Sequence, residues 1–315
     1  MKTKITYSLL AAAAACSLAN AQTTAYTTPV GYYNYDAKAG GNLFIAGLVN
    51  ATVFTGAITA DGATTLTVNS EAITAGAFNS ANSYATHYVE ITQAGSNQGV
   101  VIDIASNTNS VITLASDISA LNLAGTETIS VRPHVTLSAV FAAAEASLSA
   151  YSDNVTFPNP DGSSNTYYYL ESGVWSSDFA TPDGSDRPIA PGTGVVFSTA
   201  ADLPLTVVGE VKSTDTVVQV SGGGVVNIVG PVNPLAGSSG LIKDLGFADM
   251  EAYSDNITIY PPGNLETSIA TYYALGDGTV SVDFATPSDD TFSFTQGAVY
   301  AAASDTSIRI KSGLQ

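Results

Sequence analysis

Apolar and polar residues alternate in short runs along most of the chain after residue 28. Residues 30–35 and 87–92 are examples, and they are rich in Tyr, Val and Ile. Alternation with a period of two, bounded by Gly, Asn or Asp turns, is typical of half-buried β-strands. Apolar residues at helical spacing occur at 138–146 and at 241–250. The pattern therefore predicts an all-β protein with two short helices.

Three blocks of sequence occur twice, in the same order and at nearly the same spacing. Asp153 and Asp255 lie 102 positions apart, and Asp178 and Asp283 lie 105 apart, so three residues have been gained in an intervening loop. This repeat predicts two homologous β modules, each with a short helix, whose strands share one register. The blocks are Tyr-Ser-Asp-Asn at 151–154 and 253–256, Thr-Tyr-Tyr at 166–168 and 271–273, and Asp-Phe-Ala-Thr-Pro at 178–182 and 283–287.

The two copies differ by one long segment. Residues 53–132 contain several short strands at the spacing of a small barrel, and 233–240 is the only sequence in the matching place of the second copy. Because loop tips tolerate insertions, we expect a small β-barrel inserted into the first module. The strand-like pair at 208–211 and 227–232 resembles that at 30–35 and 42–49, which places the start of the second module near residue 205. The predicted division is a signal peptide at 1–21, β module 1 at 22–52 plus 133–204, the inserted barrel at 53–132, and β module 2 at 205–315.

The first 21 residues have the pattern of a secretory signal peptide. A basic start with Lys2 and Lys4 precedes an apolar run at 5–18, and Ala19-Asn20-Ala21 has the form of a cleavage site. The apolar run is too short to span a bilayer comfortably, so no transmembrane span is expected in the mature chain. A lipoprotein signal acylated at Cys16 is the alternative, but Ala13 stands where such signals have Leu. We expect export to the periplasm, the cell surface or the medium.

Charge and composition narrow the possible partners. Cleavage removes two of the nine basic residues, which leaves seven against 27 acidic residues, a formal charge of −20. Nucleic acid is excluded as a partner because its phosphates require a basic face. The mature chain has no cysteine, so disulfides and thiolate metal sites are excluded as well. Hydrophobic residues make up 45% of the chain, which indicates a folded protein.

Several segments resemble one family of bacterial proteins. The matching residues are 29–31, 88–92, 129–133, 166–169 and Trp175. They resemble a functionally uncharacterised family of secreted, β-rich, internally duplicated proteins known from Verrucomicrobia and relatives. In that family a basic pair often follows the Trp, whereas Ser176 and Ser177 stand here. The resemblance implies the architecture and export, and it implies no activity.

The tyrosine-rich strands are the first candidate for a binding site. Tyr167 and Tyr169 face one side of a strand, Tyr168 faces the other, and Trp175 follows across a hairpin. An exposed row made of Tyr167, Tyr169, Trp175 and Tyr272 would offer flat apolar faces with polar tips to sugar rings. The alternative is a tyrosine-rich core with cross-strand pairs, and the sequence favours it.

Acidic loop residues are the second candidate. Asp153 and Asp255 are repeated, and Asp183 and Asp186 lie after the first Thr-Pro pair, so the four are weak calcium candidates. No stretch has the alternating form of a dedicated calcium loop, and Asp also begins turns through bonds to its own backbone. Turn formation is therefore the favoured role. We expect no cofactor, with calcium left open.

Catalysis has little support in the sequence. His87 and His134 are the only histidines, and abundant carboxylates do not select one pair for a glycoside hydrolase. We expect a non-enzymatic structural or adhesive protein of the cell surface, whose partners are polysaccharide or other surface proteins. The alternative is an extracellular carbohydrate-binding protein, and a glycoside hydrolase is less favoured than either.

Overall fold

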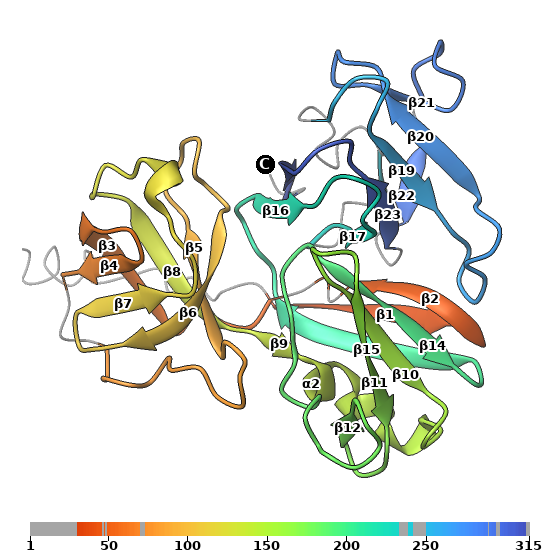
Figure 1. Ribbon diagram of the computed structural model, residues 1–315, viewed down its shortest axis with the longest axis horizontal. Coiled ribbons are helices and arrows are strands. Elements are labelled where there is room, and N and C mark those ends of the chain that lie inside the picture. Colours follow the sequence, from red (N-terminus) through yellow and green to blue (C-terminus); the bar gives the residue numbers. More distant parts are fainter. Residues whose placement is uncertain are drawn as a thin grey trace, which may run out of the picture.

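The structure is a computed structural model that describes residues 30–312 apart from 46, 48, 70–72, 233–238, 242–249, 289 and 294–296 (Figure 1). It confirms the prediction of an all-β fold. Within the described part of the chain no helix is long and apolar enough to cross a membrane. The predicted signal peptide at 1–21 and most of the helix expected at 241–250 lie outside the described residues.

The segment 53–132 forms the small barrel that the sequence predicts. Six strands close in the order β3-β4-β7-β6-β5-β8, and each of them pairs with its two neighbours in the barrel. Alternate side chains such as Leu66, Val89 and Ile104 fill its core. The strands are β3 (Phe54–Asp61), β4 (Thr65–Val68), β5 (His87–Ile91), β6 (Val101–Asn107), β7 (Val111–Leu114) and β8 (Thr128–Pro133).

The first module is built on a five-stranded antiparallel sheet of order β12-β11-β10-β14-β2. Its inner face packs on α2 (Leu137–Phe141), whose N-terminus is capped by the Thr136 side chain, and on the following 3₁₀ helix η2 (Ala142–Ser147). Its sheet strands are β2 (Gly40–Ile45), β10 (Asn154–Pro158), β11 (Ser164–Tyr169), β12 (Trp175–Ser176) and β14 (Gly194–Thr199). Two further strand pairs complete it, the long pair of β1 (Val30–Ala37) with β15 (Leu203–Glu210) and the short pair of β9 (Val135–Thr136) with β13 (Pro188–Ile189).

The module boundary differs from the one predicted at residue 205. Strand β15 crosses that position, pairs with β1 along its whole length, and places Leu203, Leu205 and Val207 in the first core. Val208 and Gly209 look like a second copy of Val30 and Gly31, but they belong to the strand that pairs with the first copy. The first module therefore extends to about residue 210, because strand pairing decides which core receives the side chains.

The second module repeats the strand order of the first. Its five-stranded sheet has the order β21-β20-β19-β23-β17, and the pair β16–β24 occupies the place of β1–β15. The register also agrees, since Thr156 opposite Thr166 corresponds to Thr258 opposite Thr271. The strands are β16 (Thr216–Val220), β17 (Asn227–Val229), β19 (Asn256–Ile259), β20 (Ala270–Ala274), β21 (Val280–Ser281), β23 (Ala298–Ala301) and β24 (Thr306–Ile310), with β18 (Ser239–Leu241) and β22 (Thr291–Ser293) as a further pair.

The two sheets contact each other through equivalent residues. Leu43 and Val196 of the first sheet and Ile228 and Val299 of the second, which occupy matching register positions, form one small apolar cluster. A contact in which the same face of each partner is used is the geometry of a two-fold interface. As a result the outer strands β12 and β21 lie at opposite ends of the body (Figure 1).

A buried group of four charges joins the barrel to the first module. The Arg132 guanidinium lies 2.6 Å from the Glu210 carboxylate and 3.4 Å from that of Glu90, and Lys212 Nζ lies 2.9 Å from Glu90. Their side chains are at most 8% exposed. Burial lowers the pKa of Lys212, and the neighbouring Glu90 carboxylate opposes this shift. We call these residues, Glu90, Arg132, Glu210 and Lys212, the junction cluster.

Candidate functional site

The aromatic residues expected to form an exposed row are buried. Tyr167, Tyr169 and Tyr272 are 4–5% exposed, and Trp175 is fully covered. The Trp175 ring packs 5.1 Å from Phe141 and 5.5 Å from Tyr169 in the first core. The exposed-row hypothesis for these four rings is therefore wrong, and the tyrosine-rich core describes them. Successive side chains of a strand point to opposite faces. Tyr168 and Tyr273, which adjoin these buried residues, therefore lie on the outer face of their sheets.

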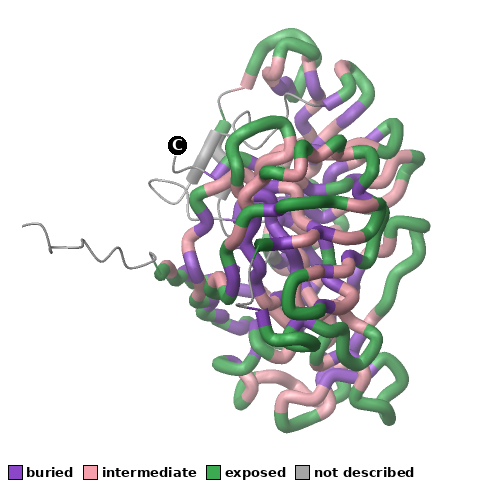
Figure 2. The backbone as a smooth tube through the Cα atoms, turned by 90° about the vertical axis from the view of Figure 1, so that its left-hand side faces the viewer, coloured by how far each residue is buried: buried purple, intermediate pink, exposed green. Residues whose placement is uncertain are grey.

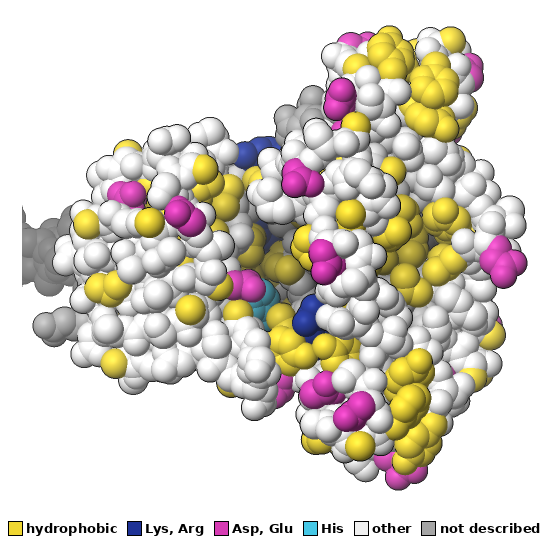
Figure 3. All heavy atoms as spheres, viewed as in Figure 1, with side chains coloured by type: hydrophobic (Ala, Val, Ile, Leu, Met, Phe, Trp, Pro, Cys, Tyr) yellow, Lys and Arg dark blue, Asp and Glu magenta, His cyan; other side chains and the backbone are white. Residues whose placement is uncertain are grey.

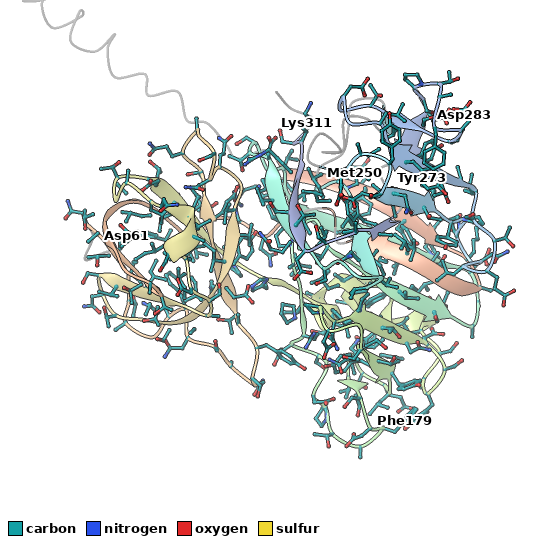
Figure 4. All side chains as sticks on the ribbon, turned by 45° about the horizontal axis from the view of Figure 1, so that its top comes forward. Asp61, Phe179, Met250, Tyr273, Asp283 and Lys311 are labelled. Atoms are coloured by element: carbon teal, nitrogen blue, oxygen red, sulfur yellow. The ribbon has the colours of Figure 1, made fainter. Side chains whose placement is uncertain are left out.

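On that outer face each module carries a stacked aromatic pair. Tyr168 and Phe179 stack with ring centroids 4.2 Å apart and planes at 29°, and Tyr273 and Phe284 do so at 4.1 Å and 28°. Phe179 is 48% exposed and Phe284 is 47% exposed. We call these two pairs the aromatic stacks. Figure 4 labels Phe179 at the lower edge of the molecule and Tyr273 in its upper right part, so the two aromatic stacks lie far apart.

The backbone at the aromatic stacks is strained. Phe179 and Phe284 have φ of 63° and 62°, and Tyr151 and Tyr253, which we call the turn tyrosines, have φ of 61°. The left-handed conformation costs a bulky residue on the order of 1 kcal/mol. The other described non-glycine residues with positive φ are small and polar, and Asn is common in this conformation: Asn82, Ser83, Asn122 and Ser172.

Stacking on Tyr168 and Tyr273 offsets part of this strain at Phe179 and Phe284, but the turn tyrosines gain little from packing. The turn tyrosines are 61% and 64% exposed, so their rings bury little apolar surface. Gly or Asn would relax all four positions, yet Tyr and Phe stand at both matching pairs. Bulky exposed rings occur in strained turns at matching places of both modules. This indicates a functional role for the rings, such as contact with a ligand. Figure 2 shows that the upper and lower ends of the body are formed by exposed loops, around a buried interior.

Two aspartates hold the turns that present Phe179 and Phe284. Asp178 Oδ1 accepts hydrogen bonds from the amides of Ala180 and Thr181, at 2.9 and 2.6 Å, and from the buried Ser176 hydroxyl. Asp283 makes the same bonds in the second module. These bonds, the Thr181 amide first among them for Asp178, hold the pKa of both carboxyls well below the ordinary range. The turns are therefore preformed.

Replacing Asp178 with Ala should make the amide protons of Ala180 and Thr181 exchange with solvent on the order of tenfold faster, because each loses a hydrogen bond to a charged acceptor. Hydrogen exchange followed by NMR measures this. The same protein contains its control, since protection around Asp283 should not change. Equal protection at Ala180 in both proteins would contradict the role given to Asp178.

The pH dependence of the same signal has a definite sign. A carboxyl with a lowered folded-state pKa stabilises the turn fully above the unfolded-state pKa of about 4, and the contribution is lost as pH falls through the folded-state pKa. The protection factor of Ala180 in the wild-type protein should therefore hold from neutral pH to about pH 4 and decline only in stronger acid.

Neutral polar side chains border each aromatic stack. Asn154 lies opposite Tyr168 in the sheet, and Ser198 lies opposite Asn154 on the next strand. Two residues further along the same strands, the hydroxyls of Thr156 and Thr166 share a hydrogen bond of 2.8 Å. All are partly exposed. The second module repeats the arrangement with Asn256 beside Tyr273 and with Thr258 bonded to Thr271 at 3.1 Å. We call these residues the polar rows. Figure 3 shows hydrophobic side chains gathered at the lower and upper ends of the face in view.

The four calcium candidates hold loops and do not converge on one point. Asp153 accepts from the amides of Ser149 and Ala200, and Asp255 accepts from the equivalent amides of Glu251 and Ala303 and from the Tyr300 hydroxyl. Asp183 binds Ser177, and Asp186 accepts from the Asn82 amide. Within the described residues no three His, Cys, Asp or Glu side chains are grouped as metal ligands. These contacts agree with the turn role of Asp153 and Asp255.

The two histidines lie where the chain leaves the barrel. His134 Nε2 is 3.0 Å from Asp103 Oδ1, and its ring packs against Tyr88. His87 bonds to the Thr86 hydroxyl and packs on Phe78, and burial lowers its pKa. These contacts give both histidines a structural role at the point where the chain passes from the barrel to the first module.

A groove of about 210 Å³ lies between the two modules. Phe157, Ile189, Val218 and Ile228 line it, together with Arg187, whose guanidinium lies 5.0 Å from the centre of the Phe157 ring. The side chains of the groove belong to the contact between modules, which makes it a weaker candidate.

Sequence reasoning missed Phe179, Phe284 and the turn tyrosines as site residues, although all four lie in the repeated blocks. Repetition of an apolar residue inside a polar loop was the available signal. Comparisons with protein-family models, with curated proteins and with solved structures found no match.

Proposed function

We propose that this protein is an exported, non-enzymatic adhesive protein that bridges two ligands through equivalent sites at its two ends. Each site consists of an aromatic stack, a turn tyrosine and the adjoining polar row. The observation that carries the proposal is the presence of four bulky, exposed rings in the left-handed conformation at matching positions of both modules.

The placement of the sites favours bridging. The modules pack through the cluster of Leu43, Val196, Ile228 and Val299, and the outer strands β12 and β21 beside the aromatic stacks lie far apart, so one small ligand does not reach both stacks (Figure 1). Two weak sites on one rigid body bind a repetitive surface far more tightly than either site alone. Adhesion needs this property.

The chemistry of the sites favours binding over catalysis. The nearest carboxylates, Asp178 and Asp283, are occupied by backbone amides and stay ionised over the ordinary pH range. Tyr and Phe rings offer surface for contact and no general base at neutral pH. Two equivalent exposed sites also differ from the single enclosed cleft typical of an enzyme.

The test compares wild-type mature protein with Phe179→Ala, Phe284→Ala and the double variant on cell envelopes of the source organism. We expect each single variant to bind envelopes but not to aggregate them. One intact site is sufficient for binding, whereas aggregation requires two sites on the same molecule. The double variant should lose both. Labelled protein in pull-down assays and light scattering measure the two effects.

Tyr32→Ala is the matched control, because Tyr32 is also an exposed aromatic residue, at 72%, but lies on β1 away from both stacks. It should bind and aggregate envelopes as the wild-type protein does. Wild-type binding by the double variant would overturn the proposal. Circular dichroism of each variant verifies that the fold is retained.

A further inference from the structure

We infer that the ligand of the two sites is a neutral polysaccharide, an inference that rests on the proposed adhesive function. The outer face of each aromatic stack is a flat, rigid apolar surface of the kind that packs against the C–H face of a sugar ring. A peptide or lipid would need a groove or a continuous apolar patch. The aromatic stacks are instead bordered by the polar rows, which suit the hydroxyls of a sugar.

The polar rows supply the groups that sugar hydroxyls require. Asn154 offers an amide that both donates and accepts, and the hydroxyls of Thr156, Thr166 and Ser198 do the same. The same chemistry stands in the second module at Asn256, Thr258 and Thr271. An apolar platform with a few neutral polar groups beside it matches an uncharged carbohydrate.

The charge of the chain restricts the class further. A mature chain with a formal charge of −20 repels anionic polymers such as polyuronates. Direct bonds to a cationic polymer at the stacks are limited, because the oxygens of Asp178 and Asp283 already accept hydrogen bonds within their turns. A neutral glycan is not repelled by the negative charge of the chain and does not need free carboxylates at the stacks.

The geometry favours a chain of sugars over a single unit. Thr166 stands two residues before Tyr168 on β11, about 7 Å along the strand at 3.3–3.4 Å per residue. The polar row therefore continues beyond the stack, and a ligand that uses both must extend past one ring. We expect oligosaccharides to bind more tightly than their monosaccharides.

Affinity electrophoresis of the full mature protein tests the inference. The probes are soluble neutral polysaccharides, a β-glucan, a xylan, a galactomannan and dextran, with alginate and chitosan as charged counterparts. At least one neutral probe should retard the wild-type protein, and Phe179→Ala/Phe284→Ala should weaken that binding about tenfold or more, as expected for lost stacking. Phe179→Tyr/Phe284→Tyr should retain it.

A second variant separates the polar rows from the aromatic stacks. Thr166→Val/Thr271→Val has the same shape as the wild type and leaves the stacks in place, so weaker binding to the same glycan would support the rows as ligand contacts. No retardation by any neutral probe, or equal retardation of the Phe double variant, overturns the inference. So does self-association that disappears in that variant, since the stacks would then bind a second copy of the chain.

The experiments distinguish a wrong ligand class from a wrong adhesive function. If the Phe double variant loses envelope binding while no neutral glycan binds the wild type, adhesion stands and the ligand class is wrong. If envelope binding persists in the double variant, the adhesive function itself falls.

Discussion

Replacing Glu90 with Gln should lower the free energy of unfolding by about 3–5 kcal/mol, because removal of one partner leaves the others as uncompensated buried charges. Glu90 is fully buried and contacts Lys212 at 2.9 Å and Arg132 at 3.4 Å. In the variant only Glu210 remains to balance two cations in the junction cluster. Lys212 has no access to water there, since its side chain is 1% exposed.

Urea denaturation followed by circular dichroism measures the change. The double variant Glu90→Leu/Lys212→Met removes a cation with its anion and should recover most of the loss, since apolar replacement of a whole buried pair is often neutral. Lys38→Ala, which breaks an exposed ion pair with Asp36 and Asp202, is the surface control and should leave stability nearly unchanged. A Glu90→Gln protein as stable as the wild type would show that the cluster does not hold the junction.

Replacing Trp175 with Ala should destabilise the protein by about 3–5 kcal/mol, the range for truncation of a large buried aromatic residue. Trp175 is fully covered and packs against Phe141 and Tyr169. By contrast, Phe179→Ala four residues later removes an exposed ring and leaves the left-handed backbone conformation unchanged, so its effect on stability should stay within about 1 kcal/mol.

This pair of variants separates folding from binding in one loop. Trp175→Ala should lower the melting temperature, while Phe179→Ala should keep it and lose bridging. The equivalent of Trp175 in the second module is Val280, and Val280→Ala should cost less because a smaller side chain leaves a smaller cavity. A Trp175→Ala protein that is stable but has lost binding would show that Trp175 belongs to the binding site and not only to the core.

The sequence was sufficient to predict the barrel and the strand blocks of both modules. Alternation and turn residues specify strands locally, and the absence of 53–132 from the second copy marked the insertion. The boundary near residue 205 was wrong because local likeness between Val208-Gly209 and Val30-Gly31 says nothing about pairing. Pairing of β15 with β1 is set by the whole core, which a local pattern does not contain.

The site was harder to predict for two physical reasons. Alternation places Tyr167 and Tyr169 on the same face of β11, but which face turns inward depends on α2 and the other strands that cover it. The left-handed conformation of Phe179 is also invisible in the sequence, because the residues typical of it are Gly, Asn and Asp. Only the repeat of Asp-Phe-Ala-Thr-Pro hinted that this turn matters.

The self-complementary contact between Leu43, Val196, Ile228 and Val299 has a consequence for the protein in dilute solution. Two separate subunits joined by such a contact would come apart on dilution, since the fraction of dimer depends on protein concentration. Here both halves belong to one polypeptide, so the distance between the two ends is the same at any concentration. Dilution into a large volume therefore leaves the two aromatic stacks on one molecule, as the proposed bridging function requires.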